Sequence, residues 1–506
     1  MRDRLAVKNG VITLGCQLSD VILGFIVRKI FITYIGVEML GLNGTFTSLL
    51  STLSLAELGF ESAVIYSLYK PLQEKNTNMV EEIVVILKRI YELVGGFIII
   101  AGIALSFFLP QILKGIEITK TIYVAFYLQL LGSAITYFMA YKKTFLLAQQ
   151  KDYVRNIFSS IFKTVATILQ IILILLYHNY LLYVAVSVGQ NFLTNYSMAV
   201  YVDKHYNFNF YRKRINISLL HKLISNVKDI FFGKLAGYVY SSTDNIVISA
   251  FVGTLSVGLL GNYTQILYQI KTVVNNVFTS TKPVIGHFLN AEKDKDHVFE
   301  ILKDYTFVRY VVCVALFVPG FVLCDCFIFS WLGQEYVMAT AISLLLVTDI
   351  FIHFVHGALV DYIAGLGYFK ADRNISIIGA VINITISVIL VNIIGISGVL
   401  IGTVISQSFF WISRSWIIFR DYFKNERGKL KNYWSTCIIY ILTFYVLCLL
   451  CRSAFNYIPM SNSYLKFIAG GIICYIISIP VIFLLFRKSR EFVFLMDILS
   501  KYIHRK

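Results

Sequence analysis

Apolar stretches of about twenty residues recur along the whole sequence, with few charges inside them. A helix needs about 20 apolar residues to cross the hydrocarbon core of a membrane, so each stretch predicts one membrane-spanning helix. We expect about fourteen spans, near residues 10–35, 44–69, 91–113, 121–141, 156–177, 180–202, 229–252, 257–280, 306–332, 338–366, 374–394, 397–419, 434–456 and 464–486. The sequence therefore predicts an all-α membrane protein.

Composition excludes a soluble alternative. The 506 residues are 58% hydrophobic and 14% charged, whereas soluble domains carry about 25% charged residues. The basic start of the chain, with Arg2, Arg4 and Lys8, resembles a secretory signal, but no small-residue cleavage site follows, so we interpret it as the first span. The eight cysteines lie in apolar runs, so we expect no metal site, no disulfide and no cofactor.

The positive charges predict the orientation. Lys and Arg gather in alternate connections, for example at residues 142–155, 204–228 and 420–431, and such connections lie in the cytoplasm. Both termini are therefore expected in the cytoplasm. The net charge of +17 follows from this topology, so membrane lipids are the expected partner of the basic loops and nucleic acid is not.

An internal duplication is visible in the turns. Gly36 is followed by Gly41-Leu42, and Gly253 is followed at the same spacing by Gly258-Leu259. A second repeated motif pairs Lys70-Pro71 with Lys282-Pro283, and a third pairs Ile86-Leu87-Lys88 with Ile301-Leu302-Lys303. The three repeats have offsets of 212 to 217 residues. Because the offset is an even number of spans, we expect two six-helix lobes related by an axis along the membrane normal, with a cavity between them. The predicted division is 1–227, 228–420 and 421–506, the last part holding two C-terminal helices and a tail.

Ionisable groups within the spans are costly and often line a cavity, so they are the candidate site residues. In the first span, Arg28 shares a face with Gln17, and Asp20 lies two turns earlier. The second span carries a polar stripe at helical spacing, with Glu57 at its edge. The stripe consists of Thr47, Ser51, Ser54 and Glu61. The alternative to a cavity lining is an internal salt bridge between Arg28 and a carboxylate.

Three lysines add to these positive charges. Lys163 lies among hydroxyl residues of the fifth span, Lys234 shares a face with Asn245 in the seventh, with Asp244 at the edge, and Lys271 lies in the eighth. Snorkelling of the lysines to the cytoplasmic surface is the alternative. With Arg28, they predict a cationic cavity suited to a phosphate or pyrophosphate group.

The tenth span carries Asp349, His353 and His356 at i, i+4 and i+7, hence on one helix face. This pattern suits relay of a proton or binding of a cation, and Asp20 is a further candidate for ion coupling. Packing, or a hydrogen-bonded structural triad, is the alternative.

The motifs together resemble a known family. Residues 28–44, Leu53-Ser-Leu-Ala-Glu-Leu-Gly59 and Tyr66-Ser-Leu-Tyr-Lys-Pro71 are similar to the Wzx-type polysaccharide flippases of the multidrug/oligosaccharidyl-lipid/polysaccharide (MOP) exporter superfamily, and residues 243–249 and 395–403 support the resemblance. The resemblance implies a transporter, not an enzyme, that moves an undecaprenyl-pyrophosphate-linked oligosaccharide across the cytoplasmic membrane of a bacterium. It places Arg28, Glu57 and Asp244 within recurrent motifs. It also implies alternating access, and partners among the polymerases and glycosyltransferases of polysaccharide assembly.

Ion-gradient coupling, by H⁺ or Na⁺, is expected because the sequence holds no phosphate-binding loop for a nucleotide. Two alternatives within the superfamily remain: a cation-coupled multidrug exporter, and a flippase for lipid II or a teichoic-acid precursor. A membrane-embedded glycan polymerase or ligase normally needs a large external loop, whereas the longest external connections here have about a dozen residues.

Overall fold

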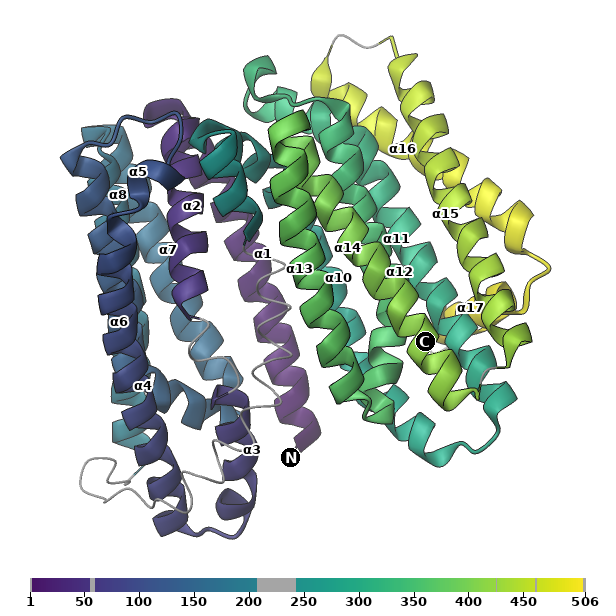
Figure 1. Cartoon of the computed structure of the whole chain (residues 1–506), viewed down its shortest axis with the longest axis horizontal. Coiled ribbons are helices and arrows are strands. Elements are labelled where there is room, and N and C mark those ends of the chain that lie inside the picture. The colour runs from purple at the N-terminus through teal and green to yellow at the C-terminus, as the bar shows by residue number, and fades with distance from the viewer. Residues whose placement is uncertain (1, 55–59, 207–242, 425, 460–461, 504–506) are drawn as a thin grey trace. The chain divides into compact units, whose positions relative to one another are not determined.

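A computed structural model describes residues 2–54, 60–206, 243–424, 426–459 and 462–503 (Figure 1). These residues form helices joined by turns, with no strand among them, which confirms the all-α class. The chain divides into two compact units, unit 1 at Met1–Gly258 and unit 2 at Leu259–Lys506. The predicted three-part division, with its boundaries at 227 and 420, stays a prediction.

Unit 1 contains long helices joined by short turns. They are α1 (Arg2–Tyr34), α2 (Val37–Leu53), α3 (Phe60–Gln73), α4 (Thr77–Ser106), α5 (Leu109–Ile112), α6 (Lys120–Ala148), α7 (Asp152–Tyr177) and α8 (Tyr180–His205). Residues 243–251 are also helical. The core is aromatic and aliphatic, with Phe46 packed edge-on against Phe126 at 5.2 Å between ring centroids.

Unit 2 begins within α10 (Thr254–Ala291). It continues with α11 (Lys295–Trp331), η2 (Gln334–Tyr336), α12 (Thr340–Leu366), α13 (Phe369–Ile394), α14 (Ile396–Ile417), the π-helical turn η3 (Ile418–Tyr422), α15 (Arg427–Asn456), α16 (Ser463–Phe486) and α17 (Arg490–Ile503). The buried helix α11 carries much of the core, where Tyr310 stacks on Tyr440 of α15 at 4.3 Å and Phe307 meets Phe486 of α16 at 5.3 Å.

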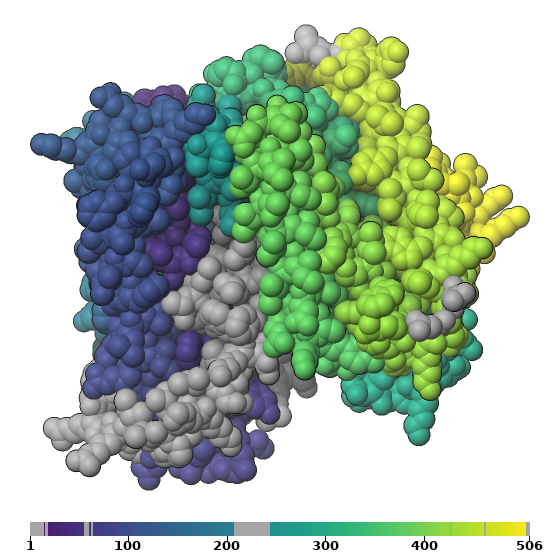
Figure 2. Space-filling view, in the orientation of Figure 1, coloured from purple at the N-terminus to yellow at the C-terminus, as the bar shows by residue number. Residues whose placement is uncertain are grey.

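Eight of the described helices are long and apolar enough to cross a membrane: α6, α7, α11, α12, α13, α14 with η3, α15 and α16. Many of their exposed side chains are large and apolar, as a lipid-facing surface requires. On α13, which lies on the visible outer face of unit 2 in Figure 2, Ile378, Val381 and Ile393 are exposed. The chain is therefore a multi-pass membrane protein, and the count of fourteen spans stays a prediction.

Several predicted spans agree with helix ends to within a few residues. The predicted spans 397–419 and 464–486 correspond to α14 with η3 and to α16. Residues 55–59 of the predicted span 44–69 lie outside the described residues, between the end of α2 at Leu53 and the start of α3 at Phe60. The helical spacing expected to join Thr47 to Glu61 therefore stays a prediction.

Two glycines of the duplicated motif open equivalent helices. Gly36 precedes α2 with a φ of 109°, and Gly253 precedes α10 with a φ of 132°. Only glycine adopts such backbone angles without steric cost. The repeated glycine thus marks the same sharp turn at two places in the chain.

The terminal helices are fastened to α11 at both of its ends. Near the start of α11, Lys429 of α15 pairs with Asp296 at 2.7 Å, and Glu491 of α17 pairs with Lys303 at 2.8 Å. Near its other end, Arg452 of α15 pairs with Asp325 at 2.9 Å. Ion pairs and ring contacts therefore bind α15, α16 and α17 into unit 2.

Candidate functional site

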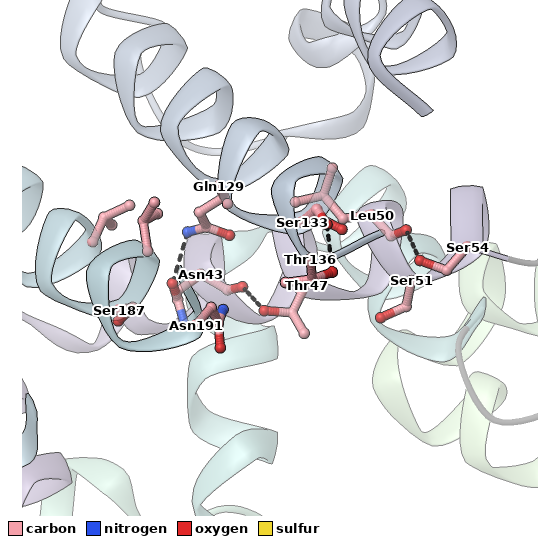
Figure 3. A pocket seen from close by; sticks show the side chains of 13 residues that line it. Asn43, Thr47, Leu50, Ser51, Ser54, Gln129, Ser133, Thr136, Ser187 and Asn191 are labelled. Atoms are coloured by element: carbon pink, nitrogen blue, oxygen red, sulfur yellow. Dashed lines mark hydrogen bonds between the residues drawn. The ribbon is translucent and has the colours of Figure 1, made fainter. Parts of the chain in front are cut away.

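A polar cavity of about 400 Å³ lies within unit 1, between α2, α6 and α8 (Figure 3). Hydroxyl and amide side chains make up nine of its thirteen lining residues. These nine are Asn43, Thr47, Ser51, Ser54, Gln129, Ser133, Thr136, Ser187 and Asn191, and the other four are Leu50, Gly132, Val184 and Val188.

Much of the polar lining follows from helical spacing on α2 and α6. Thr47 and Ser51 of α2 and Ser54, which caps its C-terminus, follow one another at intervals of four and three residues, and Gln129, Ser133 and Thr136 do the same on α6. Such residues share one face of a helix, so each helix turns a polar strip toward the cavity (Figure 3).

Hydrogen bonds hold part of the lining in place. Gln129 Nε2 donates to Asn43 Oδ1 at 2.8 Å, which joins α6 to α2, and also donates to the Tyr180 hydroxyl at 3.4 Å. Gln170 of α7 donates to the hydroxyl of Ser187 at 2.8 Å from behind the wall. Buried polar groups need such partners, and these bonds orient the amides before any ligand arrives.

A glycine sets the distance between two walls of the cavity. A Cβ atom on Gly132 of α6 would stand 2.8 Å from Cγ2 of Val188 on α8. The missing side chain therefore permits the close approach of α6 and α8 beside the cavity.

The charged residues that the sequence singled out in unit 1 lie outside this lining. Lys163 of α7 forms an ion pair with Asp20 of α1 at 2.8 Å. Glu61 on α3 pairs with Lys143 at 3.9 Å. Arg28 donates from Nη2 to the backbone oxygen of Gly258 at 3.5 Å.

Three further candidates fall near or beyond the edge of the described residues. Asp244 lies on the helical segment 243–251, where its neighbour Asn245 donates to the hydroxyl of Ser48 on α2 at 3.0 Å. Glu57 and Lys234 lie outside the described residues.

In unit 2, the predicted cation Lys271 and the predicted coupling residue Asp349 meet. Lys271 Nζ of α10 donates to Asp349 Oδ2 of α12 at 3.3 Å, and Gln407 Nε2 of α14 donates to Asp349 Oδ1 at 3.1 Å. The Asp349 side chain is 5% exposed, so this carboxylate is buried and is bound from two other helices. A charge in such a place needs these partners.

The two histidines of α12 bind other helices. His353 Nε2 lies 3.2 Å from Asn275 Oδ1 of α10 and donates to it. His356 Nδ1 donates to the backbone oxygen of Ile352 at 2.7 Å, and its Nε2 accepts from Arg414 Nη1 at 2.9 Å. This arrangement fixes His356 in its neutral form, because both ring nitrogens are engaged and Arg414 can only donate.

Comparisons with known proteins reveal the fold. No family model and no curated protein matches the sequence. Among solved structures, the lipid II flippase MurJ in an inward closed conformation aligns with a TM-score of 0.69 at 16% identity, over 94% of this chain and 99% of that one. An inward-facing multidrug resistance MATE transporter of the MOP superfamily aligns with a TM-score of 0.57 at 15% identity, over 81% and 97%. A MATE structure in complex with MaD3S aligns with a TM-score of 0.52 at 15% identity, over 82% and 95%.

The chain shares its fold with these solved structures. They are a lipid II flippase and MATE transporters. The finer assignment to the Wzx type stays a prediction.

Unit 2 also contains buried ion pairs that could not be predicted from the sequence. Arg309 of α11 donates to Asp361 Oδ2 of α12 at 2.5 Å and to the Tyr305 hydroxyl at 2.8 Å. The Asp361 side chain is 1% exposed. A second cluster joins Asp325 of α11 to Arg452, with the Tyr263 hydroxyl donating to Asp325 at 3.0 Å. Each of these charges is visible in the sequence as a single ionisable residue within an apolar run. Which charge pairs with which depends on how the helices pack.

Proposed function

We propose that this protein is a flippase that moves an undecaprenyl-pyrophosphate-linked oligosaccharide from the inner to the outer leaflet of a bacterial cytoplasmic membrane. The polar, uncharged cavity of unit 1 is the observation that carries the proposal. Sugars present many hydroxyl groups that both donate and accept, and the cavity offers the same chemistry in return. The likeness of fold to MurJ supports the same class of transporter.

The pyrophosphate is assigned to the basic residues. Arg28, Lys163 and Lys271 are the described members of the predicted cationic set, and Lys234 completes it. Lys163 and Lys271 each hold a carboxylate, Asp20 and Asp349 respectively, so an entering pyrophosphate exchanges with that carboxylate. Such an exchange keeps each lysine paired, and a proton taken up by the displaced carboxylate would spare buried Asp349 the cost of an unpaired charge.

The cycle that we propose is alternating access. The headgroup enters from the inner leaflet while the polyprenyl tail stays in lipid, and an H⁺ or Na⁺ gradient supplies the driving force. Both termini lie in the cytoplasm in this scheme, where glycosyltransferases supply the lipid-linked cargo. A polymerase on the outer side then consumes it for capsule, exopolysaccharide or O-antigen-type assembly.

A cation-coupled multidrug exporter is the second candidate, because MATE transporters share the fold. An organic cation favours aromatic and carboxylate groups around it. Neither type is among the thirteen described residues that line the cavity. This composition favours the oligosaccharide. A flippase for lipid II or a teichoic-acid precursor would use the same mechanism on another cargo.

Reconstitution tests the proposal. Purified protein in liposomes is supplied with an undecaprenyl-pyrophosphate oligosaccharide that carries a fluorescent label on its sugar, and a membrane-impermeant quencher reports how much label crosses the bilayer. We expect crossing with the native chain and its loss with Arg28→Ala, whereas Arg89→Ala, at an exposed ion pair with Glu92, retains it. Efflux of cationic dyes without movement of the labelled lipid would instead favour the multidrug exporter.

A further inference from the structure

We propose that the unit 1 cavity is a subsite for one uncharged sugar of the cargo, a hexose or an N-acetylhexosamine, and that it rejects uronic acids and protonated amino sugars. This inference rests on the proposed function and narrows it, because it names the sugar class that the transporter accepts.

The charge of the lining is the first reason. The thirteen lining residues that the structure describes include no Asp, Glu, Lys, Arg or His. A carboxylate or ammonium group placed there would lose part of its water without gaining an opposite charge from the described lining, which is unfavourable for an ion. An uncharged hydroxyl or acetamide group loses only hydrogen bonds, and the lining replaces them.

The charges elsewhere in unit 1 strengthen this point. Besides the pairs of Lys163 and of Lys143, Lys142 of α6 binds Asp203 of α8 at 2.6 Å and Lys88 of α4 lies 3.9 Å from Glu92. These four lysines already have carboxylate partners, so they add little net positive field to attract an acidic sugar. Arg28, which binds the backbone oxygen of Gly258, is the unit 1 cation that the proposed function gives to the pyrophosphate.

The available donors and acceptors are the second reason. Gln129 uses Nε2 to bind Asn43, so Gln129 Oε1 remains to accept and Asn43 Nδ2 remains to donate. Asn191 of α8 adds an exposed amide, and Ser51 adds a hydroxyl. Paired donors and acceptors of this kind match a sugar hydroxyl, which donates one bond and accepts others, and they also match the N–H and C=O of an acetamide.

Shape and apolar contact are the third reason. Leu50, Val184 and Val188 lie among the polar groups of the lining. A pyranose has polar edges and apolar C–H faces, so a wall that mixes amides with aliphatic side chains complements both. A hydrated ion gains no stabilisation from these aliphatic contacts, because it has no apolar surface to bury.

Free monosaccharides test the subsite without transport. Purified protein in nanodiscs is heated with N-acetylglucosamine, glucose, glucuronate or glucosamine at matched concentration and ionic strength, and the unfolding temperature is recorded. A ligand that binds only the folded state raises this temperature. We expect a rise with the two uncharged sugars and none with the two charged ones.

Substitutions in the cavity sharpen the result. Asn191→Leu should weaken binding of N-acetylglucosamine about tenfold, the effect of losing about one good hydrogen bond to a polar site. Gln190→Leu, one residue earlier on α8 and outside the lining, should leave binding unchanged. Ser51→Lys should add binding of glucuronate, because it supplies the missing positive charge. Equal or stronger binding of glucuronate by the native chain, or undiminished binding by Asn191→Leu, overturns the subsite.

The liposome assay separates the subsite from the flippase. Binding of uncharged sugars without any crossing of the lipid-linked cargo would support the subsite and overturn the proposed flippase. Crossing of uncharged and acidic cargo at equal rates, with no monosaccharide binding, would support the flippase and overturn the subsite.

Discussion

Gly41 of α2 lies against α10, and Gly258 of α10 lies against α2. A Cβ atom on Gly41 would stand 2.8 Å from the backbone nitrogen of Gly258 and would overlap the backbone oxygen of Thr254. A Cβ atom on Gly258 would likewise overlap the backbone oxygen of Val37. Since Gly41 matches Gly258 in the duplicated motif, and Val37 matches Thr254, the two copies of the motif make the same contact with each other.

This crossing predicts intolerance at Gly41. We expect Gly41→Val to push the helices apart and to destabilise the protein by at least about 1–3 kcal/mol, the usual cost of overpacking, because backbone atoms block the new side chain. Gly44→Ala is the control on the same helix, since its Cβ would meet only Cγ1 of Val257, at 3.4 Å. Thermal unfolding in detergent measures both variants, and equal stability of the two would contradict the close crossing.

The buried pair of Arg309 and Asp361 predicts a large loss of stability. Asp361→Asn should cost about 3–5 kcal/mol, because it leaves the Arg309 guanidinium buried without its counter-charge. Asp497→Asn breaks the exposed pair with Lys501 and should cost less than about 1 kcal/mol. Chemical unfolding gives both values. An Asp361→Asn protein as stable as the Asp497→Asn protein would show that the buried pair contributes little.

Ion coupling is predicted to depend on Asp349 more than on His356. Arg414 donates to Nε2 of His356, so a proton added there would face another donor. Asp349 can accept a proton if Lys271 moves away. We expect Asp349→Asn to abolish the dependence of lipid crossing on a pH gradient, and His356→Gln to preserve it, because a glutamine oxygen can accept from Arg414. Crossing rates in liposomes with and without a gradient check both, and the reverse pattern would assign the proton to His356.

The pair of Lys163 and Asp20 allows its two interpretations to be separated. If Lys163 binds pyrophosphate, Lys163→Ala should stop lipid crossing, while Asp20→Asn should tighten binding of inorganic pyrophosphate by removing its competitor. If the pair is purely structural, either change should instead impair lipid crossing, and exchanging the two residues should restore it. Titration calorimetry with inorganic pyrophosphate and the crossing assay together decide between them.

The fold class and the glycine motifs could be predicted from sequence because each depends on local chemistry. Apolar runs predict helices in lipid. At positions 36 and 253 the backbone has positive φ angles that favour glycine. The polar strip of α2 was also visible. Its partners on α6 and α8 have similar spacing in the sequence, but only the packing shows that Gln129 and Asn191 face Ser51 across one cavity. The partners of Lys163 and Lys271 could not be predicted either, because sequence spacing does not tell which carboxylate on another helix lies opposite a lysine.

The attachment of the terminal helices to α11 has a mechanical consequence. Because Lys429 and Arg452 form ion pairs near opposite ends of α11, α15 is held against α11 at two points and cannot swing away from it about a single contact. Glu491 fastens the segment after α16 in the same way. Any tilt of α11 would therefore carry α15 and α16 along with it, so the terminal pair stiffens this part of unit 2.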